Sequence, residues 1–187
     1  MTTGLYNVLL GAAAGDAITT AEKNIAIGYG ALGAEDTHGR NIAIGDSALT
    51  LLNAGAYGYN VAIGHEAGKA MTTGVTSVLI GGLAGDALTT GSSNIAIGYA
   101  ALGAEDTGSK SIAIGEGALQ LQNNDANNYN VAIGHHAGNV ISTGTNNTLV
   151  GGIAGDALDT GDNNVAIGYN ALGQETKGDR NVAVGAN

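Results

Sequence analysis

The pentapeptide Asn24-Ile25-Ala26-Ile27-Gly28 decides the fold of this chain, because variants of it recur along the whole sequence. Successive copies follow one another in 17-residue steps, two of which are lengthened to 19. A fixed period of this kind is the signature of a repeat protein. The final residues of the copies, called marker glycines below, are Gly11, Gly28, Gly45, Gly64, Gly81, Gly98, Gly115, Gly134, Gly151, Gly168 and Gly185.

A longer repeat is superimposed on the short one. Four steps make a 70-residue super-repeat, so Gly11, Gly81 and Gly151 are equivalent positions. The segments 8–64 and 78–134 are identical at about two thirds of their positions, which indicates a duplication. We therefore interpret residues 1–187 as one repeat domain with super-repeats at about 8–77, 78–147 and 148–187, the last of them partial.

Each pentapeptide predicts a short β-strand. A β-branched residue stands three places before every marker glycine, and Ile or Val stands directly before all of them except Gly11. Between these two stands Ala, or Leu in the first coil of each super-repeat. The fold class is therefore all-β, a parallel β-roll or β-solenoid of about eleven coils of 17 to 19 residues, with a rod length of roughly 48 Å. A second short strand is expected around the Ala that follows three residues after each complete marker.

Both faces of the predicted strand are apolar, so both faces should be covered. We expect the Ile and Val side chains to fill the interior of the coil and the small Ala side chains to form an oligomer interface. The alternative is that Ala lines a narrow interior and Ile faces outward. The interface candidates are Ala26, Ala43, Ala62, Ala96, Ala113, Ala132 and Ala166.

Composition excludes several function classes. The chain has 6 Lys and Arg against 16 Asp and Glu, a formal net charge of −10, so it offers no basic surface for nucleic acid. It has no Cys, which excludes disulfides and thiolate chemistry. No apolar run approaches the roughly 20 residues of a membrane helix, and no export signal opens the chain. We expect no nucleic-acid partner, no membrane insertion, no cofactor and no enzyme activity.

The residue directly after each marker glycine varies with a fourfold rhythm. It is small, then Tyr, then acidic, then His, and these side chains should form one exposed column along the rod. Asp46 with His65, and Glu116 with His135, would be near enough for charge-assisted contacts. The column is either a contact strip for a receptor or glycan, or merely a solvated face. Its candidates are Tyr29, Asp46, His65, Tyr99, Glu116, His135 and Tyr169.

Other acidic residues do not predict a site. Asp16, Asp86 and Asp156 recur in Gly-Asp-Ala turns, where an Asp side chain caps the local backbone. A Ca²⁺ ion would need six to eight oxygens, so no metal site is assigned. The adjacent pairs Glu35-Asp36 and Glu105-Asp106 lack a defined separation for acid and base catalysis.

The repeat resembles a known family. The segment Ser111-Ile112-Ala113-Ile114-Gly115-Glu116-Gly117-Ala118 is similar to the head repeat of trimeric autotransporter adhesins, and 164–172 is similar to related arrays in phage tail fibres. The resemblance covers essentially the whole chain. It implies a left-handed parallel β-roll, three chains around a common axis, and a rigid fibre segment on a virion, a cell surface or an extracellular filament.

The function expected from this resemblance is that of a structural fibre or adhesin segment, a homotrimer that contacts a host-surface glycan or protein receptor. An autotransporter adhesin head is the alternative. A left-handed β-helix acyltransferase would repeat its aliphatic anchor three times per coil, and an ice-binding protein would need Thr on nearly every rung. Because the pattern is already under way at Met1 and stops within a coil, we also expect a longer fibre or end-to-end association.

Overall fold

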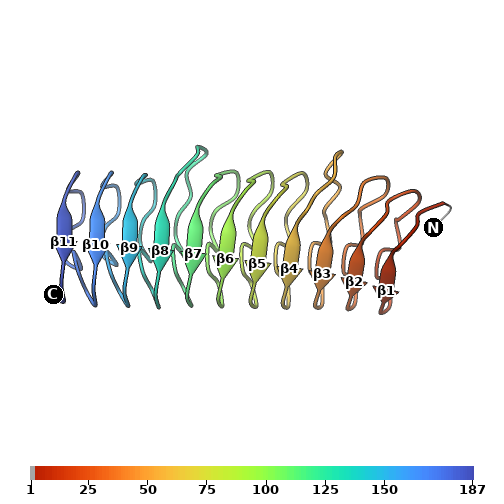
Figure 1. The fold of residues 1–187 in the computed structure, drawn as a ribbon, viewed down its shortest axis with the longest axis horizontal. Helices are drawn as coiled ribbons and strands as arrows, with labels where there is room; N and C mark the ends of the chain where they lie inside the picture. Colours follow the sequence, from red (N-terminus) through yellow and green to blue (C-terminus); the bar gives the residue numbers. More distant parts are fainter. Residues whose placement is uncertain (1–2) are drawn as a thin grey trace.

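The computed structural model, which describes residues 3–187, is an all-β parallel solenoid of about ten turns (Figure 1). Every strand pairs in parallel with the next one, in the order β1 to β11 of a single sheet, and the two termini lie at opposite ends of the rod. Met1 and Thr2 lie outside the described residues. The strands are β1 (Val8–Leu10), β2 (Ile25–Ile27), β3 (Ile42–Ile44), β4 (Val61–Ile63), β5 (Val78–Ile80), β6 (Ile95–Ile97), β7 (Ile112–Ile114), β8 (Val131–Ile133), β9 (Thr148–Val150), β10 (Val165–Ile167) and β11 (Val182–Val184).

The predicted second strand in each coil is absent from the described residues, which form turns there. After the marker glycine, the backbone φ angle alternates between positive and negative values from one residue to the next. Ser47 and Leu49 have φ values of 58° and 49° on either side of Ala48. An extended strand needs negative φ at every residue, so this alternation bends the chain into a corner instead.

The expected assignment of the two strand faces is wrong. The centres of successive strands stack in register, as in Ala26 on Ala43, and the Ala side chains point into the coil. A fully buried side chain cannot form an intermolecular surface, so the interface assignment fails for Ala26, Ala43, Ala62, Ala96, Ala113, Ala132 and Ala166, all of which are 0% exposed. The physical reason is that the coil is narrow. Other interior side chains already fill most of it, so only a small side chain fits at the centre of most strands.

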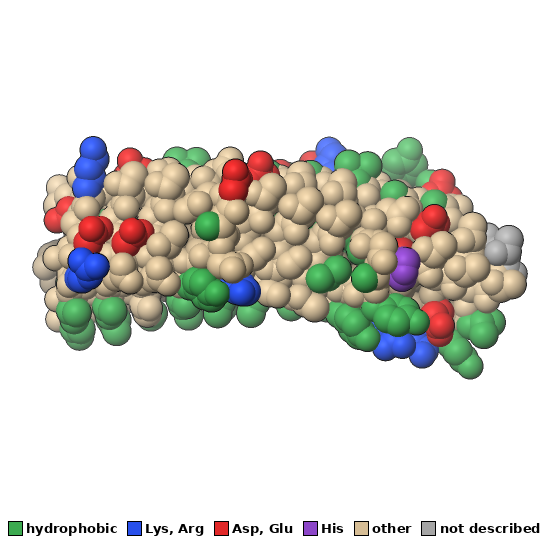
Figure 2. All heavy atoms as spheres, turned by 90° about the horizontal axis from the view of Figure 1, so that it is seen from above, with side chains coloured by type: hydrophobic (Ala, Val, Ile, Leu, Met, Phe, Trp, Pro, Cys, Tyr) green, Lys and Arg blue, Asp and Glu red, His purple; other side chains and the backbone are tan. Residues whose placement is uncertain are grey.

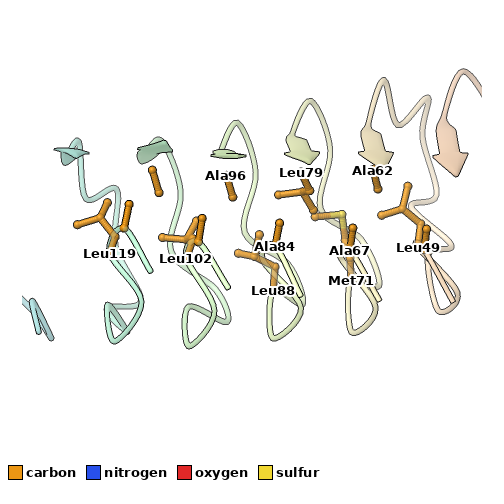
Figure 3. Packing of buried hydrophobic residues seen from close by; sticks show 14 of the residues in the cluster. Leu49, Ala62, Ala67, Met71, Leu79, Ala84, Leu88, Ala96, Leu102 and Leu119 are labelled. Carbon is orange, nitrogen blue, oxygen red and sulfur yellow. The ribbon is translucent and has the colours of Figure 1, made fainter. Parts of the chain in front are cut away.

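The interior is filled by four columns. Besides the strand centres, three further positions of each coil face the interior. They are the Ala three residues after each complete marker glycine, the Leu or Gly that follows this Ala, and the residue three places after that Leu or Gly, which is apolar in some coils and polar in others. Figure 3 shows Leu49, Leu79 and Met71 around the small side chains of Ala62 and Ala67. The Ile and Val side chains therefore lie outside, where most are half-buried and Ile63 and Ile133 are 37% and 38% exposed.

The marker glycines are fixed by close approach of successive coils. Gly98 has a φ of 135°, and a Cβ there would lie 2.5 Å from the carbonyl oxygen of Gly115. No side chain fits at that distance. The glycine column therefore permits the one-rung spacing at this corner of the rod.

An asparagine ladder joins the coils on the other side of each strand. The side-chain Oδ1 of Asn147 accepts a hydrogen bond of 2.9 Å from the backbone N–H of Asn164, and its Nδ2 donates one of 2.8 Å to the carbonyl of Gly161. The same bonds recur at Asn60 and Asn94. These buried amides satisfy backbone groups that the turns leave unpaired.

Candidate functional site

The Tyr residues of the predicted column lie exposed on the flank of the rod. Tyr29, Tyr99 and Tyr169 are 65%, 58% and 62% exposed. Each follows a marker glycine at the first residue of the turn. The ring of Tyr99 lies over Gly82 of the preceding coil, where a Cβ would be 3.6 Å from Tyr Cδ2, and Tyr169 lies over Gly152 in the same way. The glycine one coil earlier, Gly82 or Gly152, therefore leaves room for the ring.

A hollow lies beside Tyr29 and another beside Tyr99. The first, of about 320 Å³, is lined by Asp16, Tyr29, Gly33 and Thr50 among others. The second, of about 300 Å³, is lined by the equivalent residues Asp86, Tyr99, Gly103 and Gln120. The structure thus brings together the Tyr column and the Gly-Asp-Ala turns, which nothing in the sequence connects.

The chemistry of these hollows suits a polar ring with an apolar face. Tyr supplies an aromatic surface, Asp an acceptor, and Thr50 or Gln120 further hydrogen-bonding groups. Burial raises the pKa of the Asp86 carboxyl, and Glu66 adds to the rise, whereas backbone hydrogen bonds and Lys69 oppose it. A partly desolvated carboxylate binds a hydroxyl donor more strongly than one in open water.

The acidic and His members of the column divide into two groups. Asp46 accepts a hydrogen bond of 2.8 Å from the Ser47 hydroxyl, and His65 has Glu66 as its carboxylate neighbour, with His Nε2 and Glu Oε1 4.0 Å apart. The expected contact between Asp46 and His65 is not among the ion pairs of the described residues. Glu116 and His135 lie nearer to each other, with ligand atoms within 4.8 Å, but they too are not among the ion pairs of the described residues. His136, which the sequence did not point to, joins them.

A second exposed cluster was also missed. It lies where the two-residue extension of the 19-residue coil projects from the rod (Figure 1). Arg40 stacks 4.1 Å from the ring centroid of Tyr57 and donates a hydrogen bond of 2.7 Å to the hydroxyl of Tyr59. Lys110 and Tyr129 form a smaller version in the next super-repeat. The signal in the sequence was Tyr in the extension, paired with a basic residue one coil earlier.

The paired carboxylates have a structural explanation. Glu105 is 0% exposed and accepts hydrogen bonds from the Gly108 N–H and from the side chains of Gln122 and Asn128. Burial raises its pKa, and the bonds from Gln122 and the backbone offset part of the rise. Glu35 is equally buried and occupies the same place one super-repeat earlier. These carboxyls hold the turn and face no open surface.

Two further features concern membrane-spanning helices and the end of the rod. Over residues 3–187 the chain forms no helix able to cross a membrane. A hollow of about 530 Å³ is the open mouth of the last coil, lined by 170–175 and 183–187, and so it is not on the flank.

Comparison of the chain with protein-family models, with curated protein sequences and with solved structures finds no match.

Proposed function

We propose that this chain is a rigid, homotrimeric fibre segment, displayed on a virion or another extracellular surface, that contacts receptors through its flank. The observation that carries the proposal is that the outer face of the sheet is apolar along almost its whole length. Of the first and last residues of the eleven strands, all but Thr148 are Val, Ile or Leu. A chain with a net charge of −10 thus keeps one long strip free of charge.

The strip has the size of an apolar patch that commonly serves as a contact surface. Eleven rungs at about 4.8 Å, each about 10 Å wide, give a face of roughly 500 Å² from the strands alone. That approaches the largest apolar patches of monomeric proteins, and a partner sheet packing at about 10 Å would remove it from water. Hydrophobic side chains line one long edge of the rod in Figure 2.

A second and a third copy of the same chain fit this face better than an unrelated partner. The strip runs straight along the rod, so identical strips placed around a threefold axis cover one another over the full length. Closed symmetry of this kind is the usual state of homo-oligomers. The number three rests on the resemblance of the repeat to trimeric adhesins and tail fibres.

The receptor-contact part rests on the Tyr and Asp hollows. Equivalent hollows recur every four coils, about 19 Å apart along the rod. Three chains would present several such sites on one rigid body, which raises the avidity for a surface carrying many copies of a ligand. The occupant favoured by this lining is a glycan.

The mass of the particle in solution tests the oligomer. Wild-type protein should scatter light as three chains of 18.3 kDa. Changing Ile97 and Ile114 to Lys should yield monomers with an unchanged β-sheet spectrum, because unpaired charges would be buried at the interface at a cost of several kcal/mol. Thr90→Lys, on an exposed turn, is the matched control. A wild-type monomer, or a trimer that survives the double change, would overturn the proposal.

A further inference from the structure

Glu116, His135 and His136 form a compact group on the flank of the rod. One ligand atom from each lies within 4.8 Å of those of the other two, and the two imidazole centroids are 4.1 Å apart. Among the described residues, this is the one place where at least three His or acidic side chains converge so closely. Glu116 and His135 are exposed, and His136 is half-buried.

The backbone holds the three residues in place. His136 donates a backbone hydrogen bond of 2.9 Å to the carbonyl of Glu116, which fixes the two coils one rung apart. His136 has a φ of 54°, so its side chain leaves the turn beside that of His135. Its ring occupies the space above Gly117, where a Cβ would lie 2.9 Å from His Nδ1. Glycine at 117 therefore makes room for the ring.

We propose that Glu116, His135 and His136 bind one divalent transition-metal ion of the kind that prefers imidazole, such as Zn²⁺, Ni²⁺ or Cu²⁺. Two imidazoles and a carboxylate are a donor set typical of these ions. Bond lengths of about 2.0 to 2.2 Å require ligand atoms about 3.4 Å apart. Glu116 and His135 are exposed, so rotation of their side chains can bring the ligand atoms to that separation. Three protein ligands leave a coordination position open at the rod's surface.

The first super-repeat contains a natural negative control. Its equivalent residues are Asp46, His65 and Glu66, so one imidazole is replaced by a carboxylate. Glu66 is held by Lys69, with Lys Nζ and Glu Oε1 2.7 Å apart, and that ammonium group opposes a second cation. Ser47 stands where the second super-repeat has Gly117, and it fills the space that the His136 ring uses. The site thus belongs to the second super-repeat alone.

Calorimetric titration of the tag-free chain with ZnCl₂ tests the site. Wild-type protein should bind one Zn²⁺ per chain. His135→Gln, His136→Gln and Glu116→Gln should each weaken binding at least tenfold, because even the loss of an outer-shell partner costs about 10- to 100-fold. His65→Gln should bind as wild type. No binding by wild type at about 1 mM Zn²⁺, or undiminished binding by His136→Gln, would overturn the proposal.

Two further measurements identify the ligands. The electron paramagnetic resonance spectrum of the Cu²⁺-loaded protein should show two coupled imidazole nitrogens, and a spectrum without them would contradict the assignment. Transfer of the site by Ser47→Gly, Glu66→His and Lys69→Asn together should add a second bound ion per chain. Failure of that variant to gain an ion while remaining folded would refute the geometric argument. Both outcomes are independent of the proposed fibre role.

Discussion

Replacing Gln122 by Leu should destabilise the middle of the rod, although Leu is the natural residue at the equivalent position 52. Gln122 is 0% exposed, and its Nε2 donates hydrogen bonds of 2.9 Å to Glu105 Oε2 and to Ser111 Oγ. Its Oε1 accepts one of 2.8 Å from Asn130 Nδ2. Leu52 is also fully buried, so the space accepts either side chain.

The magnitude follows from these bonds. Loss of three buried hydrogen bonds, at about 1 kcal/mol each, lowers the free energy of unfolding by about 3 kcal/mol. Burial of the more apolar Leu returns about 1 to 2 kcal/mol. Glu105 keeps its bonds to Gly108 and Asn128, and Asn130 keeps one to Gly144. The difference between the two contributions is a net loss of about 1 to 2 kcal/mol at neutral pH.

The loss should depend on pH in a definite direction. Burial raises the folded-state pKa of Glu105, so its contribution to stability is complete below the ordinary carboxyl pKa and disappears as pH rises through the folded value. The bond from Gln122 lowers that pKa. Without it, the pKa rises further and the decline extends to higher pH. The variant should therefore approach wild type in acid and diverge from it towards neutral pH.

Urea unfolding followed by circular dichroism from about pH 4 to about pH 8 measures this difference. Because repeat proteins can unfold locally, hydrogen exchange of residues 104–130 should be recorded alongside it. The reciprocal variant Leu52→Gln is the matched control. It offers a donor to Glu35 Oε2, which makes no hydrogen bond to any described residue. A free-energy difference that is constant with pH would refute the reasoning.

Three further outcomes are expected. Gly98→Ala should cost at least about 2 kcal/mol in denaturant unfolding, because its Cβ would collide with Gly115, whereas Gly55→Ala, with a φ of 65° and open space, should cost only about 1 kcal/mol. Asn147→Ala should cost about 2 to 4 kcal/mol because it leaves two buried backbone groups unpaired, and the exposed Thr143→Ala should change stability by less than about 0.5 kcal/mol. Tyr99→Ala should reduce glycan-array binding of intact trimers by about 1 to 2 kcal/mol of affinity per site, and binding that is unchanged would remove the hollow from consideration.

The sequence predicted the solenoid because the spacing of the glycines is a property of the whole chain. Strand positions, the number of coils and the exposure of the Tyr column all follow from that spacing. It could not predict which strand face lies inside, because Ala and Ile are both apolar and a period of two fits either choice. The decisive information was elsewhere in each coil. Leu49 and Leu52 also point inward, and with them inside only a small side chain fits at Ala43.

The side-chain clusters were predictable only in part. Residues one rung apart in the same column, such as Glu116 and His135, could be placed together from spacing alone. His136 could not, because neighbouring residues in a strand or regular turn point apart, and its approach to His135 depends on a positive φ. The buried network around Glu105 was likewise predictable only in part. Gln122 follows Glu105 in the same interior column and could have been placed beside it from the spacing, whereas Asn128 comes from the lengthened turn of the 19-residue coil and reaches Glu105 by a path that the spacing does not predict.

The four-coil period itself has a packing cause. Leu79 occupies the strand centre of its coil, and its two δ-methyl groups fill the space beside Gly68 of the preceding coil and Gly85 of its own. A Cβ at Gly68 would lie 2.7 Å from one methyl group, and a Cβ at Gly85 would lie 2.9 Å from the other. Leu149 fills the same space beside Gly138 and Gly155. Large and small residues are therefore matched between neighbouring coils, and a single coil is not an interchangeable unit.

Deletions should follow this matching. Removing residues 78–94 takes out one coil with Leu79 and leaves a void beside Gly68, equivalent to a Leu→Ala change of about 2 to 5 kcal/mol. Removing 78–147 takes out four coils but places the coil of Leu149 after that of Gly68, which restores the contact. Hydrogen exchange at 61–77 should therefore be faster than wild type in the short deletion and close to wild type in the long one. Equal protection in the two variants would show that the coils are interchangeable and that the 70-residue period has no basis in the packing of the interior.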